Sequence, residues 1–228
     1  TMPEDAPALR QEYLLRLGAQ ILHSPAQRGL AGARALAETT AAEKGWYYMD
    51  WLNNDDNPTY HRRVTGPALV RSIAREGSSI VDCIVIGVGS GGTITGVGET
   101  VKAWTNDVRI VAVEPYESQA LSSGLTGSHG IPDIGFGLVP GNYNSYVVDN
   151  IAAVTTADAV RAAQRDAQLG GNGDLALIAD LGLDPNIRRG VVQIKIPAVD
   201  IEALGLQIGV ERKRQIDIGL EKHLHGAG

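Results

Sequence analysis

The segment from Cys83 to Thr100, CIVIGVGSGGTITGVGET, contains the residues whose types and spacing are best suited to chemistry. An apolar run leads into a glycine-rich turn, and the turn opens a segment with helical character. Residues 89–93, Gly-Ser-Gly-Gly-Thr, combine glycines, which let backbone N–H groups turn inward, with two hydroxyl groups. A helix N-terminus behind such a turn favours an anion. The pattern therefore predicts a loop that binds phosphate.

Two classes of phosphate ligand fit this turn. Gly87, Gly89 and Gly92 satisfy G-x-G-x-x-G, the pattern of a dinucleotide-binding Rossmann fold. Glu114 ends the next apolar run about twenty residues later, where the acid of such a fold contacts a ribose hydroxyl. The five residues 89–93 suit equally well the single terminal phosphate of pyridoxal phosphate. A tight strand-to-helix turn without any ligand is the third alternative.

The elements that position this loop predict an α/β fold with a mostly parallel sheet. Continuous apolar runs are typical of strands buried on both faces, and they occur at residues 79–87, 109–115 and 191–196. Helical patterns alternate with the strands, at residues 28–44, 61–76, 94–103 and 157–169, and the second of them is expected to be interrupted near Gly66-Pro67. The aromatic run 46–52 and residues 145–155 are expected as strands, and 116–145 as a loop-rich segment. The tail 211–225 fits a helix only loosely and is expected to lie along the surface.

The composition excludes several classes of function. The 228 residues are 43% hydrophobic and 20% charged, as is ordinary for a globular protein, and the net charge of −6 argues against nucleic-acid and membrane partners. No apolar run reaches the length of a membrane span and no signal peptide is visible, so a cytoplasmic location is expected. The single cysteine, Cys83, is expected to be a small buried residue. His223 and His225 lie two residues apart, which indicates solvated side chains, and no metal site is predicted.

Five sequence motifs carry a resemblance to a known family. They are TMPE with the following LLRLGAQILHSPA, NPTYHRRVTGP (57–67), GVGSGGTITGVG, IVAVEP (110–115) and HGIPDIGFGLVP (129–140). Their order and spacing resemble the cysteine synthase and cystathionine β-synthase family of fold-type-II pyridoxal phosphate enzymes. The resemblance covers roughly residues 1–168. It favours pyridoxal phosphate over a dinucleotide, and it leaves Glu114 without a ribose to bind.

The resemblance implies both an architecture and a cofactor site. The architecture is a three-layer α/β sandwich like that of tryptophan synthase β. Residues 1–64 would be part of a small N-terminal domain and residues 65–228 the large cofactor-binding domain, with 170–228 unassigned. The residues implied to hold the cofactor are Gly89, Ser90, Gly91, Gly92 and Thr93 at the phosphate, with Gly135 beside the ring. Asp133 stands where the family has a glycine, so its carboxylate either affects the choice of substrate or points to solvent.

The implied activity is β-elimination and replacement on a small serine-derived amino acid, and it requires a lysine that binds the cofactor and moves the Cα proton. The lysines of the chain are Lys44, Lys102, Lys195, Lys213 and Lys222, and none has the S-x-K context of the family. Lys102 is expected as a surface residue. No catalytic residue is therefore assigned.

Three explanations stay open for the missing lysine. The chain is part of a longer enzyme, or it is one chain of a split enzyme, or it is a non-catalytic relative that binds the cofactor or a partner protein. A homodimer, or an association with a chain that supplies the lysine-bearing segment, is expected.

Overall fold

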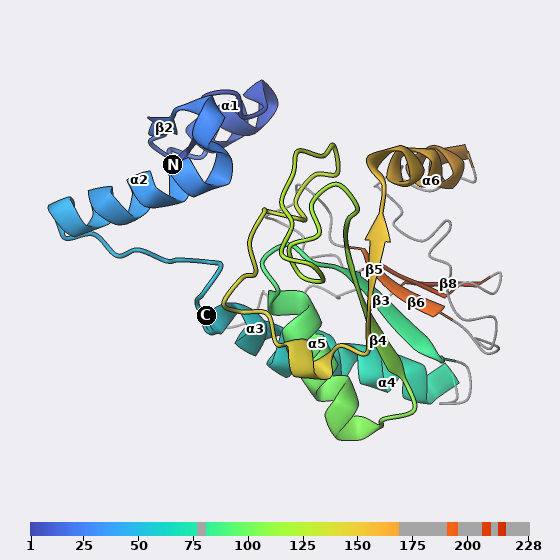
Figure 1. The fold of residues 1–228 in the computed structure, drawn as a ribbon. Helices are drawn as coiled ribbons and strands as arrows, with labels where there is room; N and C mark the ends of the chain where they lie inside the picture. Colours follow the sequence, from blue (N-terminus) through green and yellow to red (C-terminus); the bar gives the residue numbers. More distant parts are fainter. Residues whose placement is uncertain (77–80, 169–190, 196–206, 211–213, 218–228) are drawn as a thin grey trace. The chain divides into compact units, whose positions relative to one another are not determined.

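The computed structural model describes residues 1–76, 81–168, 191–195, 207–210 and 214–217 (Figure 1). The chain divides into two compact units, Thr1–Asp50 and Trp51–Gly228. The sequence analysis draws its boundary near residue 64, and the assignment of the two parts to family domains stays a prediction. Among the described residues, no helix combines the length and the hydropathy that crossing a membrane requires.

The smaller unit consists of two helices and a short pair of strands. The strands pair in parallel, Met2 beside His23 and Pro3 beside Ser24. The elements in chain order are β1 (Met2–Pro3), α1 (Ala8–Arg16), β2 (His23–Ser24), η1 (Ala26–Arg28) and α2 (Gly29–Lys44). Gly45 ends α2 in the left-handed conformation with φ 64°, which a glycine adopts without steric cost. The helix expected over residues 28–44 is therefore confirmed to within one residue.

Residues 46–52 form no strand, and the expectation drawn from their aromatic composition was wrong. Tyr47 is 79% exposed and Met49 63%, so these side chains lack the half-buried sheet surface that favours aromatic residues in strands. Asp50 has a φ of 37°, outside the range of a strand. Its carboxylate pairs with the Arg34 guanidinium on α2 at 3.2 Å between Nη2 and Oδ2. A polar contact to a helix thus takes the place of strand pairing.

The larger unit contains a six-stranded sheet with the order β5-β4-β3-β6-β7-β8. The strands are β3 (Cys83–Gly87), β4 (Arg109–Pro115), β5 (Asn150–Val154), β6 (Val191–Lys195), β7 (Gln207–Val210) and β8 (Arg214–Asp217). The first four are parallel to one another, whereas β7 pairs antiparallel with β6 and β8 antiparallel with β7. The expected mostly parallel sheet is confirmed. In the tail, Arg214–Asp217 forms a strand, and its histidines lie outside the described residues.

Helices cover both faces of this sheet, which gives the three expected layers. The helical elements of this unit are α3 (Asp56–Tyr60), the π-helical turn η2 (His61–Thr65), α4 (Gly66–Glu76), α5 (Gly92–Trp104), the 3-10 turn η4 (Ser145–Val147) and α6 (Thr156–Gln168). Of these, α4 and α5 pack on one face of the sheet and α6 on the other. The helix expected over 61–76, with an interruption near Gly66-Pro67, consists of η2 and α4, which meet at Gly66. Pro67 is the second residue of α4, directly after the π-helical turn.

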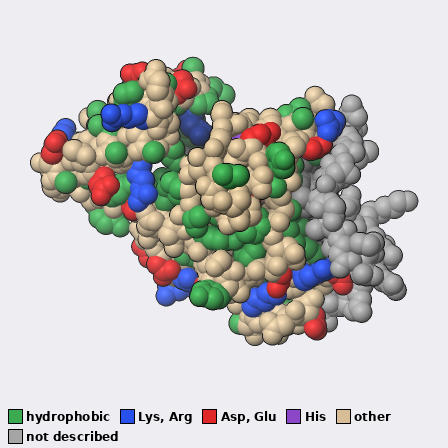
Figure 2. Space-filling model, in the orientation of Figure 1, with side chains coloured by type: hydrophobic (Ala, Val, Ile, Leu, Met, Phe, Trp, Pro, Cys, Tyr) green, Lys and Arg blue, Asp and Glu red, His purple; other side chains and the backbone are tan. Residues whose placement is uncertain are grey.

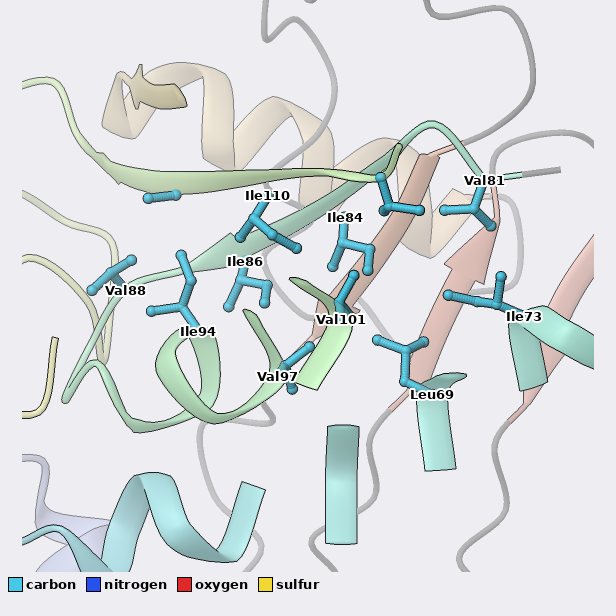
Figure 3. Packing of buried hydrophobic residues seen from close by; sticks show 12 residues of the cluster. Leu69, Ile73, Val81, Ile84, Ile86, Val88, Ile94, Val97, Val101 and Ile110 are labelled. Atoms are coloured by element: carbon cyan, nitrogen blue, oxygen red, sulfur yellow. The ribbon is translucent and has the colours of Figure 1, made fainter. Parts of the chain in front are cut away.

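The alternation of side chains along β3 and β4 builds a core on each face of the sheet. On one face, Ile84, Ile86 and Ile110 pack against side chains of α4 and α5 (Figure 3). On the other face, Val85 and Val113 belong to a cluster that includes Ala159 of α6. These continuous apolar strands are buried on both sides, as parallel strands between helical layers must be. Figure 2 shows acidic and basic side chains interspersed over the visible surface, as expected for a small net charge.

Candidate functional site

The glycine-rich loop, residues 89–93, connects the carboxyl end of β3 to the first turn of α5. Gly91 is the N-cap of α5 and has a φ of 81°, which strongly favours glycine. Among the described residues, none accepts a hydrogen bond from the backbone N–H of Ser90, Gly91 or Thr93. These donors stand at the positive end of a 13-residue helix, where an anion is stabilised.

Close neighbours surround the loop and leave no room for side chains at its glycines. A Cβ on Gly89 would lie 2.3 Å from the carbonyl oxygen of Asp133, and one on Gly92 would lie 1.9 Å from Oδ1 of Asn57. A Cβ on Gly91 would lie 2.9 Å from the backbone nitrogen of Tyr143. The shape of the loop is therefore fixed by protein packing.

Asn57 ties the loop to the start of the larger unit. Its Nδ2 donates to Oγ of Ser90 at 3.0 Å and to the carbonyl oxygen of Trp51 at 3.0 Å. Nδ2 of Asn142 donates to the same Trp51 carbonyl at 2.8 Å. Because Ser90 accepts from Asn57, its own hydroxyl proton is left to donate elsewhere.

The second hydroxyl of the loop, that of Thr93, contacts a partly buried histidine. Oγ1 of Thr93 lies 3.2 Å from Nε2 of His61, and Nδ1 of His61 lies 2.9 Å from Oγ1 of Thr65. Burial lowers the pKa of His61 from 6.5 to about 4, so the imidazole is neutral at pH 7. With its proton on Nε2, the ring donates to Thr93 and leaves the threonine proton for another acceptor.

The segment 129–140 lies directly beside the glycine-rich loop. The N–H of Gly135 donates to the carbonyl of Val88 at 3.2 Å, and Nε2 of His129 lies 2.8 Å from the Gly135 carbonyl oxygen. Asp133 is exposed and has a φ of 60°, and its backbone carbonyl faces Gly89. The structure thus brings Gly135 and Asp133 next to the five residues of the predicted phosphate site.

Two aromatic side chains extend this group of residues. The rings of Trp51 and Phe136 meet edge to face, with centroids 5.4 Å apart and an interplanar angle of 85°. Cε2 of Phe136 lies 3.5 Å from the position that a Cβ of Gly89 would take. Trp51 is 43% exposed. The aromatic pair therefore borders the first residue of the loop.

Glu114 has a structural role in the turn that follows β4. The residue is 1% exposed, and its carboxylate accepts the backbone N–H of Leu121 at 2.8 Å and that of Ser122 at 3.2 Å. The hydroxyl of Ser122 donates to it as well. The carboxylate thus fixes the turn after β4, and the ribose contact of the dinucleotide alternative is not available to it.

The remaining reactive groups have structural roles. Cys83 is fully buried, as expected, and burial raises the pKa of its thiol to about 11. Nζ of Lys102 donates to the Asp149 carboxylate at 2.7 Å and to the Val108 carbonyl at 3.2 Å, with 19% of the side chain exposed. Lys102 is more enclosed than expected. Within the described ranges, no three histidine, cysteine or acidic side chains gather to hold a metal ion.

Comparison with known proteins decides between the two phosphate ligands. Residues 1–172 match the family model of the pyridoxal-phosphate dependent enzymes. The chain belongs to this family. The cofactor of the family is pyridoxal phosphate, as the motifs predict, and the dinucleotide alternative is set aside.

Individual relatives and solved structures show which members of the pyridoxal-phosphate family this chain is similar to. The chain is 34% identical over 168 residues to the cysteine synthase of Staphylococcus aureus, a match that covers 74% of this chain and 53% of the relative. Cysteine synthase from Entamoeba histolytica superposes with a TM-score of 0.74 at 28% identity, over 86% of this chain and 59% of that one. An O-ureido-L-serine synthase gives a TM-score of 0.74 at 26% identity, over 84% and 61%. The chain spans about half the length of the curated relatives it matches.

Four residues at the site were missed by the sequence analysis. Asn57 and His61 lie in the motif NPTYHRRVTGP, which carried the resemblance without assigning them a role. Trp51 lies in the run misread as a strand, and Phe136 in the motif that supplied Gly135. Only the motif positions gave a signal, because contacts between segments far apart in sequence leave no local pattern.

Proposed function

We propose that residues 89–93 bind the phosphate of pyridoxal phosphate and that the chain forms part of an enzyme for β-elimination and replacement on a serine-derived amino acid. The observation that carries the proposal is the set of N–H groups of Ser90, Gly91 and Thr93 at the head of α5, for which the described part of the chain provides no acceptor. A dianion is the ligand best matched to such donors. The fit extends to the hydroxyl proton of Ser90, whose oxygen accepts from Asn57, and to that of Thr93 when His61 carries its proton on Nε2.

The described residues supply binding and orientation. The loop holds the phosphate through backbone donors, and neutral His61 orients the Thr93 hydroxyl without placing a second charge beside it. Gly135 fixes the adjacent segment against Val88, so that the loop and segment 129–140 keep one geometry. When bound, pyridoxal phosphate supplies an electron sink for negative charge at the substrate Cα.

The substrate class follows from what the related proteins are named for. They include O-ureido-L-serine synthase and an O-acetylserine dependent cystathionine β-synthase from Helicobacter pylori, which is 26% identical with a TM-score of 0.68. Both names specify a serine whose side-chain oxygen carries a substituent. We propose the same class for this chain, an O-substituted L-serine.

The proton-moving lysine has no candidate among the described side chains. Lys102 is held by Asp149 and Val108, and Lys44 lies over the ring of Trp46 at 4.6 Å. A lysine from another polypeptide segment, joined to this chain or separate, would complete the chemistry. The same observation favours a second candidate function, a non-catalytic subunit that binds the cofactor. We further propose a cytoplasmic location and a homodimer or a complex with the lysine-bearing chain.

Cofactor binding tests the site. Pyridoxine 5′-phosphate, whose alcohol cannot react with lysines, is the probe, and calorimetry is the assay. Gly91→Val should abolish binding because its Cβ meets the Tyr143 backbone, whereas Gly124→Ala, with nothing within 4 Å, should bind like the wild type. Equal affinity of both variants would remove the loop from the site.

The reaction needs a separate test on protein purified from its natural source. Cysteine formed from O-acetyl-L-serine and sulfide would support the enzyme, and mass spectrometry of the active fraction identifies the polypeptide that carries the lysine. Cofactor binding without any turnover of O-substituted serines would support the non-catalytic subunit instead.

A further inference from the structure

The aromatic pair Trp51–Phe136 lies beside the glycine-rich loop, with Trp51 exposed and Phe136 partly buried. Trp51 is 43% exposed although its carbonyl is fixed by two amide donors, from Asn57 and Asn142. Asn57 is in turn bonded to Ser90 within the loop. The position of Trp51 is therefore coupled directly to the phosphate site.

Phe136 is fixed from the other side. It follows Gly135, whose N–H is bonded to Val88 at the end of β3, and its ring edge packs against Gly89. The rings of the pair meet at 85°, an edge-to-face arrangement that is itself favourable. A surface preorganised by contacts from three segments keeps its shape before any ligand arrives.

From this geometry we propose that Trp51 and Phe136 form an aromatic wall that contacts the pyridine ring of the bound cofactor. The inference rests on the proposed function, because the loop must hold the phosphate for the ring to lie here. Flat aromatic ligands gain affinity by stacking or edge contacts with such side chains. A ligand that carries phosphate without a ring would bind the loop alone and gain nothing from the wall.

A comparison of two probes tests the wall. Pyridoxine 5′-phosphate has both the ring and the phosphate, whereas glycerol 3-phosphate has the phosphate without a ring. The wild-type protein should bind the first at least tenfold more tightly, a difference of about 1.4 kcal/mol. Trp51→Leu and Phe136→Leu, which keep apolar volume at the site, should each weaken the ring-bearing probe about tenfold and leave the other within about twofold.

Matched controls separate the wall from general effects. Trp104→Leu removes a tryptophan that is 37% exposed at the far end of α5, and Tyr146→Leu removes an aromatic side chain that is 98% exposed. Both should leave the affinity for either probe unchanged. Circular dichroism of every variant confirms that the fold is retained.

The results that would contradict the aromatic wall can be told apart from one another. Unchanged affinity for pyridoxine 5′-phosphate in both wall variants would overturn the wall, while loss of binding in Gly91→Val would still support the phosphate loop. An equal loss for both probes would assign the aromatic pair to loop packing. A change in native mass without a change in affinity would assign it to a protein interface, and would equally overturn the proposal.

Discussion

Replacement of Gly91 by alanine tests whether the loop is shaped by protein packing. The φ of 81° costs a residue with a Cβ about 1–2 kcal/mol. The new Cβ would also lie 2.9 Å from the Tyr143 nitrogen and 3.0 Å from its Cα, and crowding of this kind costs about 1–3 kcal/mol. Gly91→Ala should therefore lower the free energy of unfolding by about 2–5 kcal/mol.

Gly124→Ala is the matched control for this change. Its φ of 71° gives a similar backbone cost, but nothing lies within 4 Å of the added Cβ, so only about 1–2 kcal/mol should be lost. The assay is urea unfolding followed by tryptophan fluorescence, in a Trp46→Phe background so that Trp51 and Trp104 report on the larger unit. Equal losses in the two variants would refute the argument that Tyr143 restricts the loop.

Three further predictions concern buried or paired groups. Because burial lowers the pKa of His61 to about 4, the unfolded state binds a proton first as pH falls, so at most about 3 kcal/mol of stability is lost between pH 6.5 and 4. His61→Gln should remove this part of the pH dependence in urea titrations. Cys83, fully buried with a thiol pKa of about 11, should react with a disulfide reagent only as fast as the protein opens, and labelling at the rate of a free thiol would contradict its burial. Lys102→Met should cost about 1 kcal/mol by removing the cation paired with Asp149, whose carboxylate keeps the N–H of Ile110, and any change in affinity for pyridoxine 5′-phosphate would argue that Lys102 does more than pair.

The sheet and its covering helices were predictable because their signals are local. The apolar runs of β3 and β4 and the periodicity of α2, α5 and α6 lie within single segments. Residues 46–52 were misread because aromatic composition suits a strand only where a neighbouring strand covers it. The π-helical turn η2 has no such local signature, and it places His61 and Thr65 one turn apart facing one another.

The site itself was predicted only where a motif specifies it. Residues 89–93, Gly135 and Asp133 come together as expected, although the roles assigned to them stay predictions. Asn57, His61 and Trp51 reach the loop from 28–38 positions upstream, as counted to Gly89. Neither periodicity nor composition reports which side chains meet across such a separation. The glycines of the loop gave one indirect signal about its surroundings. A loop with so few side chains must either admit a ligand or be closely packed by other segments, and close packing is observed here.

The same glycine spacing serves two ligand classes, so the distinction between them must come from the surroundings of the loop. A dinucleotide needs an acid at the end of the next strand with an oxygen free to accept from ribose. In this chain the acid is present as Glu114, but its carboxylate is bonded to Leu121 and Ser122 within the protein. Releasing it would break two backbone hydrogen bonds to a charged group, at a cost of about 1.5–3 kcal/mol each. The turn after β4 therefore disfavours the dinucleotide on physical grounds, independently of the motifs that indicate the family.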